Sequence, residues 1–164
     1  MRGTRPYPGD VAAPVFTYRR DYEFGLAPDR LWERLGEVDQ FEGWWPWLSE
    51  FRLEGDGLSE GSVLRGVVTP PLPYRMRLEV ELERCRPPHA IDASVRGDLV
   101  GQAQLRIRPR GDRGSTVGVA WTIEVRQPVM RLASRFGRPL LQWGHDRVVE
   151  VTVAGFRRRI ERPR

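Results

Sequence analysis

The sequence of 164 residues contains no lysine and no asparagine, so all 27 of its basic residues are arginines. Without lysine the chain cannot form a Schiff base, anchor pyridoxal phosphate or supply the lysine of a phosphate-binding P-loop. Without asparagine it has no acceptor for N-glycosylation. These absences remove lysine-dependent chemistry from the functions that the chain could perform.

Cysteine and histidine are scarce as well. Cys85 is the single cysteine, which excludes a disulfide framework and a thiolate zinc site. The two histidines, His89 and His145, lie far apart in the sequence and show no metal-ligand spacing. We therefore expect no metal site and no other cofactor.

The net charge of +5 is concentrated at the ends of the chain. Residues 1–14 carry a net charge of +1 and residues 157–164 a net charge of +4, which leaves residues 15–156 neutral. A nucleic-acid interface usually has arginines clustered on a folded face. We interpret the arginines of 157–164 as the solvated end of a helix, where cations suit the helix dipole, and expect no nucleic-acid partner. A contact of this end with nucleic acid stays open as an alternative.

The length predicts one domain, at about 150 residues per domain. Apolar residues make up 40% of the chain and charged residues 30%, which is typical of a soluble globular protein. No apolar run resembles a signal peptide or a membrane span, so we expect a cytoplasmic protein that is a monomer or a homodimer. The predicted organisation is a flexible N-terminal tail over residues 1–14, a ligand-binding domain over 15–161 and a basic C-terminal end over 162–164.

Apolar periodicity predicts the secondary structure. Val15–Phe24 alternates as a strand does, Ala27-Pro28-Asp29 opens a helix, and a short helical turn covers about 40–44. From Leu48 to Val125 the apolar period is two, interrupted by glycine and proline turns, which predicts six further strands in an antiparallel meander with one covered face.

The C-terminal segment is the predicted cover of that face. Gly137-Arg138-Pro139 should break or kink it, giving a short helix near 128–137 and a long helix near 139–161. At 100° per residue, Leu140, Trp143, Val151 and Ala154 share one arc of the long helix, which we expect to face the sheet.

This order of elements resembles the SRPBCC superfamily, also called START-related or birch-pollen-allergen-like, and within it the polyketide cyclase/dehydrase-like branch. The segments that carry the resemblance are Ala27-Pro28 with Leu31-Trp32, Trp44-Trp45-Pro46, Leu72-Pro73-Tyr74, Gly97-Asp98-Leu99, and the stretch from Trp121 to Trp143-x-His145-Asp146. The resemblance implies an α+β helix-grip fold, in which a seven-stranded antiparallel sheet wraps around a long C-terminal helix and two short helices follow the first strand. It also implies a deep apolar cavity between sheet and helix.

Strand parity and the expected helix arc give most of the candidate ligand-binding residues. Trp45 is added because one ring of the Trp44, Trp45 and Trp47 cluster could stack on a flat ligand, although packing between the short helices and the sheet is the favoured role of the cluster. The alternative is that most of these side chains simply fill the core. The candidates are Tyr18, Trp45, Tyr74, Met76, Leu78, Trp121, Leu140, Trp143 and Arg147.

Three polar side chains are candidates for catalysis. Arg147 falls within the predicted apolar arc, where a guanidinium either extends to solvent or binds an anion or carbonyl of a ligand. Tyr74 follows a proline-rich turn and could place its hydroxyl at the cavity mouth. His145 could move protons, but it lies about 200° around the helix from Trp143, so a packing or capping role is favoured.

Two functions follow. The first is a protein that binds a hydrophobic small molecule, aromatic or lipid-like, because the inward positions are nearly all apolar. The alternative is a polyketide aromatase/cyclase-like enzyme, in which Arg147 steadies enolate charge while Tyr74 or His145 transfers protons.

Overall fold

The computed structural model describes residues 15–126 and 128–160, and all structural statements below refer to them. In chain order the elements are β1 (Val15–Phe24), α1 (Pro28–Leu35), the 3-10 turn η1 (Val38–Gln40), α2 (Phe41–Trp44), β2 (Leu48–Glu54), β3 (Val63–Val68), β4 (Met76–Arg86), β5 (Ala90–Gly97), β6 (Leu99–Arg110), β7 (Gly114–Val125) and α3 (Pro128–Ile160). The tail predicted over 1–14 and the basic end over 162–164 lie outside the described residues.

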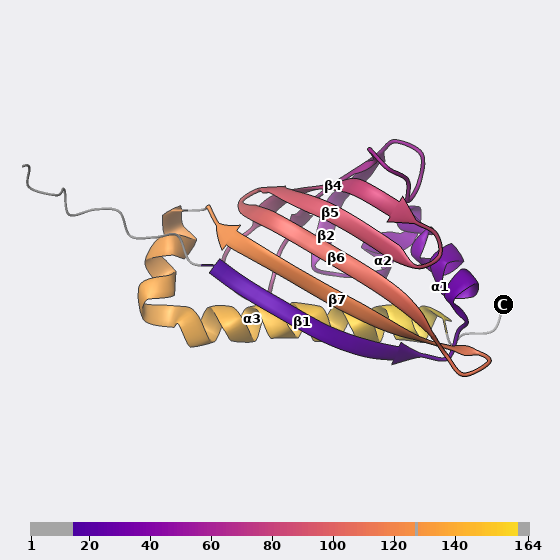
Figure 1. The fold of residues 1–164 in the computed structure, drawn as a ribbon. Helices are drawn as coiled ribbons and strands as arrows, with labels where there is room; N and C mark the ends of the chain where they lie inside the picture. Colours follow the sequence, from indigo (N-terminus) through magenta and orange to yellow (C-terminus); the bar gives the residue numbers. More distant parts are fainter. Residues whose placement is uncertain (1–14, 127, 161–164) are drawn as a thin grey trace, which may run out of the picture.

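The seven strands of the described chain form one antiparallel sheet in the order β1-β7-β6-β5-β4-β3-β2. Strands β2 to β7 form a meander. The last strand, β7, also pairs with the first strand, β1, and this pairing places Tyr18 opposite Trp121. Figure 1 shows the sheet curving over α3, with β1 beside the helix. The predicted α+β helix-grip fold is confirmed, including the short helices α1 and α2 after the first strand.

Helix α3 has a sharp kink near its start. Gly137 has φ −127° and ψ 24°, outside the helical range, so the element consists of two helices that meet there. Pro139 follows within two residues and lies in the first turn of the second helix, where a backbone N–H would have no partner within the helix, so the proline is tolerated there. The predicted break at Gly137-Arg138-Pro139 is confirmed, and Figure 1 shows the longer part of α3 running along the sheet after the bend.

The core is divided into two clusters. The larger one joins α1, α2 and the end of α3 to the sheet, through residues that include Leu31, Trp44 and Phe156. The smaller one contains Met76 of β4, Val125 of β7 and Leu141 of α3. The sheet and helix are therefore packed together at separate places along the length of α3.

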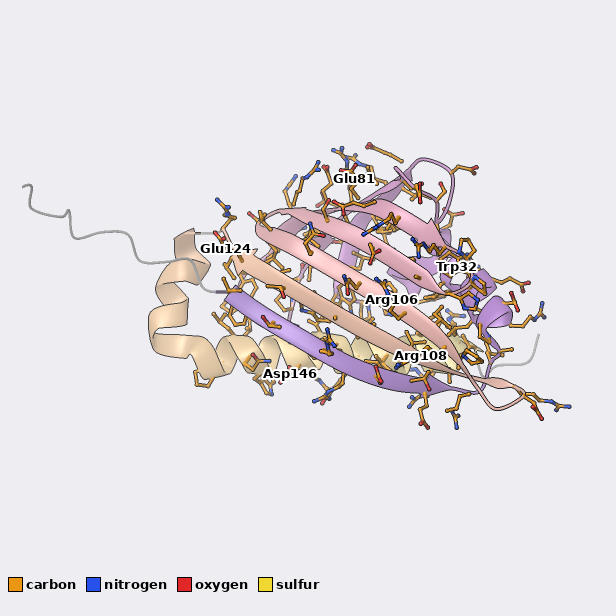
Figure 2. All side chains as sticks on the ribbon, in the orientation of Figure 1. Trp32, Glu81, Arg106, Arg108, Glu124 and Asp146 are labelled. Atoms are coloured by element: carbon orange, nitrogen blue, oxygen red, sulfur yellow. The ribbon has the colours of Figure 1, made fainter. Side chains whose placement is uncertain are left out.

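The outer face of the sheet is charged. Arg65 of β3 pairs with Glu54 of β2 at 3.3 Å and with Glu79 of β4 at 3.2 Å, and Arg96 of β5 pairs with Glu81 at 2.9 Å. Figure 2 shows such side chains projecting from the convex side, among them the labelled Glu81, Arg106 and Arg108. Because exposed pairs contribute only about 0–1 kcal/mol each, their main effect is to keep this face solvated.

No helix among residues 15–126 and 128–160 is both long enough and apolar enough to span a bilayer.

At Gly97, the last residue of β5, the backbones of β4 and β5 approach too closely for a side chain. Its φ is +108°, and a Cβ built there would lie 2.3 Å from the Arg77 carbonyl oxygen of β4. Gly111 also has a positive φ, +61°, but faces open space. We expect Gly97→Ala to lower the free energy of unfolding by about 3 kcal/mol and Gly111→Ala by about 1 kcal/mol, because only the first adds a backbone clash to the strain. Urea unfolding measures both, and equal losses would contradict this account.

Candidate functional site

A cavity of about 460 Å³ lies between the inner face of the sheet and α3. Its wall is almost entirely apolar and includes side chains from β1, α1, the segment after α2, β3 to β7 and α3. At about 30 Å³ per water molecule the cavity would hold about fifteen waters, which would find very few polar partners on this wall. Such a cavity favours an apolar ligand over water.

Five of the candidate ligand-binding residues border this cavity: Trp45, Tyr74, Met76, Leu78 and Trp121. Strand alternation explains the three that lie in strands, because positions 76 and 78 of β4 and position 121 of β7 point to the covered face. Tyr74 contributes from the loop that precedes β4, and Trp45 from the residue after α2.

The expected face of α3 is wrong. Leu140 is 55% exposed, Trp143 is 52% exposed, and the Arg147 side chain is 57% exposed. Arg147 pairs with Glu150 at 3.3 Å on the outer side of the helix. None of the three borders the cavity, so the structure removes them from the site.

The inner face of α3 is formed by a different set of side chains, namely Leu141, His145, Val148, Val149, Thr152, Val153 and Phe156. His145, for which a packing or capping role was favoured, therefore faces the cavity that Trp143 was expected to border. The predicted rotation of α3 differs from the observed one because Leu140 and Leu141 are adjacent apolar residues that point to different faces, and only Leu141 is buried.

Contacts with α2 set the rotation of the helix. The indole Nε1 of Trp45 donates a hydrogen bond to the Thr152 carbonyl oxygen at 3.1 Å. A Cβ built at Gly155 would lie 2.8 Å from the Trp44 carbonyl oxygen, so glycine allows this close approach. Further along, a Cβ at Gly144 would lie 2.5 Å from Cδ1 of Leu72. Two glycines thus mark the side of α3 that touches other segments.

Trp44 lies in a different environment from Trp45 and Trp47. Trp44 is buried in the larger core cluster. Trp45 and Trp47 stack with ring centroids 5.5 Å apart and both border the cavity. The cluster therefore joins α2 to the core through one ring and presents two rings to the cavity.

His145 is at the centre of a polar and aromatic group beside β1. Its Nδ1 is 3.1 Å from Oδ1 of Asp146, and the Nε2 of Gln142 donates to the same oxygen at 2.9 Å. The imidazole packs edge-to-face on Tyr18 at 5.1 Å and on Trp121 at 5.3 Å. Its Nε2 atom is buried and has no hydrogen-bond partner within the described residues.

Tyr18, a candidate ligand-binding residue, lies behind this group rather than on the cavity wall. Its ring stacks on Trp121 at 4.3 Å, and its hydroxyl is hydrogen-bonded to the Tyr22 hydroxyl. Burial, reinforced by that hydrogen bond, raises the pKa of Tyr18 far above its usual range. Burial likewise raises the pKa of Tyr74. Both phenols therefore stay protonated near neutral pH and act as hydrogen-bonding groups.

Residues 57–61, Gly-Leu-Ser-Glu-Gly, have the G-x-S-x-G spacing of a hydrolase nucleophile elbow. They lie between the antiparallel strands β2 and β3, whereas an elbow connects a strand to a helix. The Ser59 hydroxyl is 3.0 Å from the Ser62 hydroxyl and is hydrogen-bonded to it. We assign the motif to the turn.

Across the described part of the chain, no three His, Cys, Asp or Glu side chains gather closely enough to hold a metal ion.

A protein-family profile described as polyketide cyclase / dehydrase and lipid transport matches residues 16–161. No curated protein sequence matches the chain significantly.

Solved structures resemble the fold over nearly the whole chain. A protein from Thermus thermophilus superposes with a TM-score of 0.70 at 16% identity, over 88% of this chain and 96% of its own. The ZhuI aromatase/cyclase from a Streptomyces species gives 0.71 at 12% identity, over 91% and 95%. Norcoclaurine synthase from Thalictrum flavum, solved with dopamine and hydroxybenzaldehyde, gives 0.63 at 13% identity, over 100% and 99%. At these identities the likeness shows the fold alone.

The Asp146 carboxyl offers a direct test of the pair with His145. The hydrogen bond from His145 is the main cause that lowers the pKa of Asp146, with a smaller contribution from Gln142. We expect NMR titration to find this pKa below its ordinary value of about 3.9, and His145→Phe to raise it. Because the folded value is depressed, the bond stabilises the protein above about pH 4 and the effect is lost on acidification. An unchanged pKa in His145→Phe would contradict the pairing.

Proposed function

This chain belongs to the polyketide cyclase/dehydrase and lipid transport family of the SRPBCC superfamily, and from that premise we propose that it binds an aromatic or lipid-like hydrophobic molecule between the sheet and α3. The observation that carries the proposal is the cavity of about 460 Å³ with its nearly apolar wall. Small-molecule sites ordinarily measure about 300–1,000 Å³ and are lined mainly by apolar and aromatic side chains.

The energetics favour such a ligand. Apolar surface removed from water contributes about 25 cal/mol per Å², and the cavity wall is almost entirely carbon. Trp45, Trp47 and Trp121 add ring faces on which a flat molecule can stack. The aromatic compounds in the norcoclaurine synthase structure support an aromatic ligand within this fold.

A second candidate is a cyclase-like enzyme acting in the same cavity. The observation that favours it is that two side chains able to exchange protons, Tyr74 and His145, border the cavity. Arg147, given the role of steadying enolate charge in the sequence-based hypothesis, lies on the outer face of α3 and takes no part.

Occupying the cavity with a side chain tests the binding proposal. Val119 of β7 borders the cavity, whereas Thr122, on the opposite parity of the same strand, is exposed. We expect Val119→Trp to weaken binding of the neutral fluorophore N-phenyl-1-naphthylamine by about tenfold or more, because the indole takes up the ligand's space. Thr122→Trp is the matched control and should bind as the wild type does. Equal affinity in both variants would refute binding in this cavity.

Native mass spectrometry separates the two candidates. A binding protein should carry a co-purifying hydrophobic molecule that is released unaltered after incubation. An enzyme should convert the extracted molecule or its precursor, and Tyr74→Phe should slow that conversion by roughly 10²-fold or more while binding is retained, as for loss of a general acid. Conversion at the wild-type rate in Tyr74→Phe would exclude the tyrosine from the chemistry.

A further inference from the structure

The polar side-chain atoms at the cavity wall are few, and several of them already have hydrogen-bond partners within the protein. Thr152 borders the cavity, but its hydroxyl donates to the Val148 carbonyl oxygen at 2.6 Å. Tyr22 also borders it, and its hydroxyl is hydrogen-bonded to that of Tyr18. Two buried nitrogens among the lining residues of the described chain have no partner: Nε1 of Trp47 and Nε2 of His145.

These two nitrogens differ in what they can bind. The indole Nε1 of Trp47 carries a hydrogen and can only donate. Whether Nε2 of His145 donates or accepts a hydrogen bond depends on the tautomer of the imidazole, and the hydrogen bond to Asp146 determines that tautomer. The Asp146 carboxylate accepts at 3.1 Å from Nδ1, which places the ring proton on Nδ1 and leaves a lone pair on Nε2. Nε2 of His145 is therefore a buried acceptor that has no partner within the described residues.

The surroundings hold the imidazole in this orientation. Gln142 donates to the same carboxylate oxygen at 2.9 Å and so fixes Asp146. On the sheet side, the stacked rings of Tyr18 and Trp121 both meet the imidazole edge-to-face. The ring is thus positioned from the helix by a charged hydrogen bond and from the sheet by two aromatic contacts.

The wall lacks a countercharge for an anion. No arginine is among the lining residues of the described chain. Arg147 points away from the cavity, and the guanidinium of Arg20 lies over the Tyr18 ring at 6.0 Å. A carboxylate at Nε2 would face a lone pair, with the negative charge of Asp146 on the other side of the ring. Burial of such a charge without a partner is strongly unfavourable.

We propose that Nε2 of His145 accepts a hydrogen bond from a hydroxyl group of the ligand, so that the cavity selects neutral hydroxylated aromatic molecules over their methyl ethers and over carboxylates. This inference rests on the proposed function, because it requires a ligand in the cavity. A phenol or an enol on a flat apolar skeleton meets both conditions: the skeleton packs on the apolar wall, and the hydroxyl donates to His145. Neighbouring atoms cover Nε2 in the unbound protein, so the proposal requires the imidazole to shift toward the cavity while Nδ1 keeps its hydrogen bond to Asp146. Side-chain changes at a binding site commonly accompany ligand binding.

Three naphthalene derivatives of similar shape test the selection: 2-naphthol, which donates a hydrogen bond, 2-methoxynaphthalene, which cannot, and 2-naphthoate, which is charged. Each displaces N-phenyl-1-naphthylamine from the full-length protein at about pH 8, above the ordinary pKa of histidine and below that of a phenol. We expect 2-naphthol to bind about five- to tenfold more tightly than 2-methoxynaphthalene, the usual effect of one hydrogen bond, and 2-naphthoate to bind most weakly.

His145→Phe keeps an aromatic ring against Tyr18 and Trp121 but removes the acceptor. It should weaken 2-naphthol alone and bring its preference over 2-methoxynaphthalene to about one. Arg147→Gln, on the outer face of α3, is the matched control and should keep the wild-type preference. A preference that survives His145→Phe would overturn the inference, as would equal binding of the three compounds by the wild type.

A second measurement does not depend on any variant. The chain has two histidines, and His89 is exposed in the turn before β5, so the ¹⁵N signals of the two rings can be told apart. Nε2 of His145 should show the shift of an unprotonated nitrogen and should move when 2-naphthol is added. A protonated Nε2, or no movement on binding, would overturn the inference. If N-phenyl-1-naphthylamine itself fails to bind and nothing co-purifies, the proposed function fails instead.

Discussion

The cavity depends on one constraint, which is the contact between α3 and the end of α2. The Trp45 indole donates to the Thr152 carbonyl oxygen, and Gly155 lets the helix backbone approach that of Trp44. This contact fixes both the rotation of the helix and its height above the sheet. Since the core clusters join helix and sheet at separate places, the inner side chains between them cannot collapse onto one another, and a cavity is left.

The strands could be predicted well from the sequence because each is covered on one face. In β7, alternate residues from Val117 to Val125 border the cavity, as the period of two indicates. The residues between them point outward and are small or polar, and on the same outer face of the sheet Arg65 of β3 pairs with Glu79 of β4. With a period of two, the side chains of a strand fall on two faces, and the more apolar face is the one that is buried.

The rotation of α3 could not be predicted in the same way. A long helix beside a cavity buries its side chains incompletely, so apolar residues such as Trp143 remain on its outer face, and the apolar arc is ambiguous. The glycines of α3 indicate the rotation of the helix better than its apolar residues do. Gly144 and Gly155 are separated by about three full turns, and so lie on one side of the helix where other segments approach. That phase places His145 about 100° around the helix from Gly144, on the face that borders the cavity, whereas Asp146 lies further around and is half-exposed.

The cavity also bears on how this fold responds to compression. An apolar cavity of about 460 Å³, open along part of its boundary, is packed less densely than the surrounding core, which adds to the volume of the folded chain. Hydrostatic pressure favours the state of smaller volume, and the volume lost on unfolding scales with the internal void that disappears. A bound molecule would fill that void with dense matter. The space that receives the ligand therefore makes this protein sensitive to pressure, and occupancy would make it less compressible.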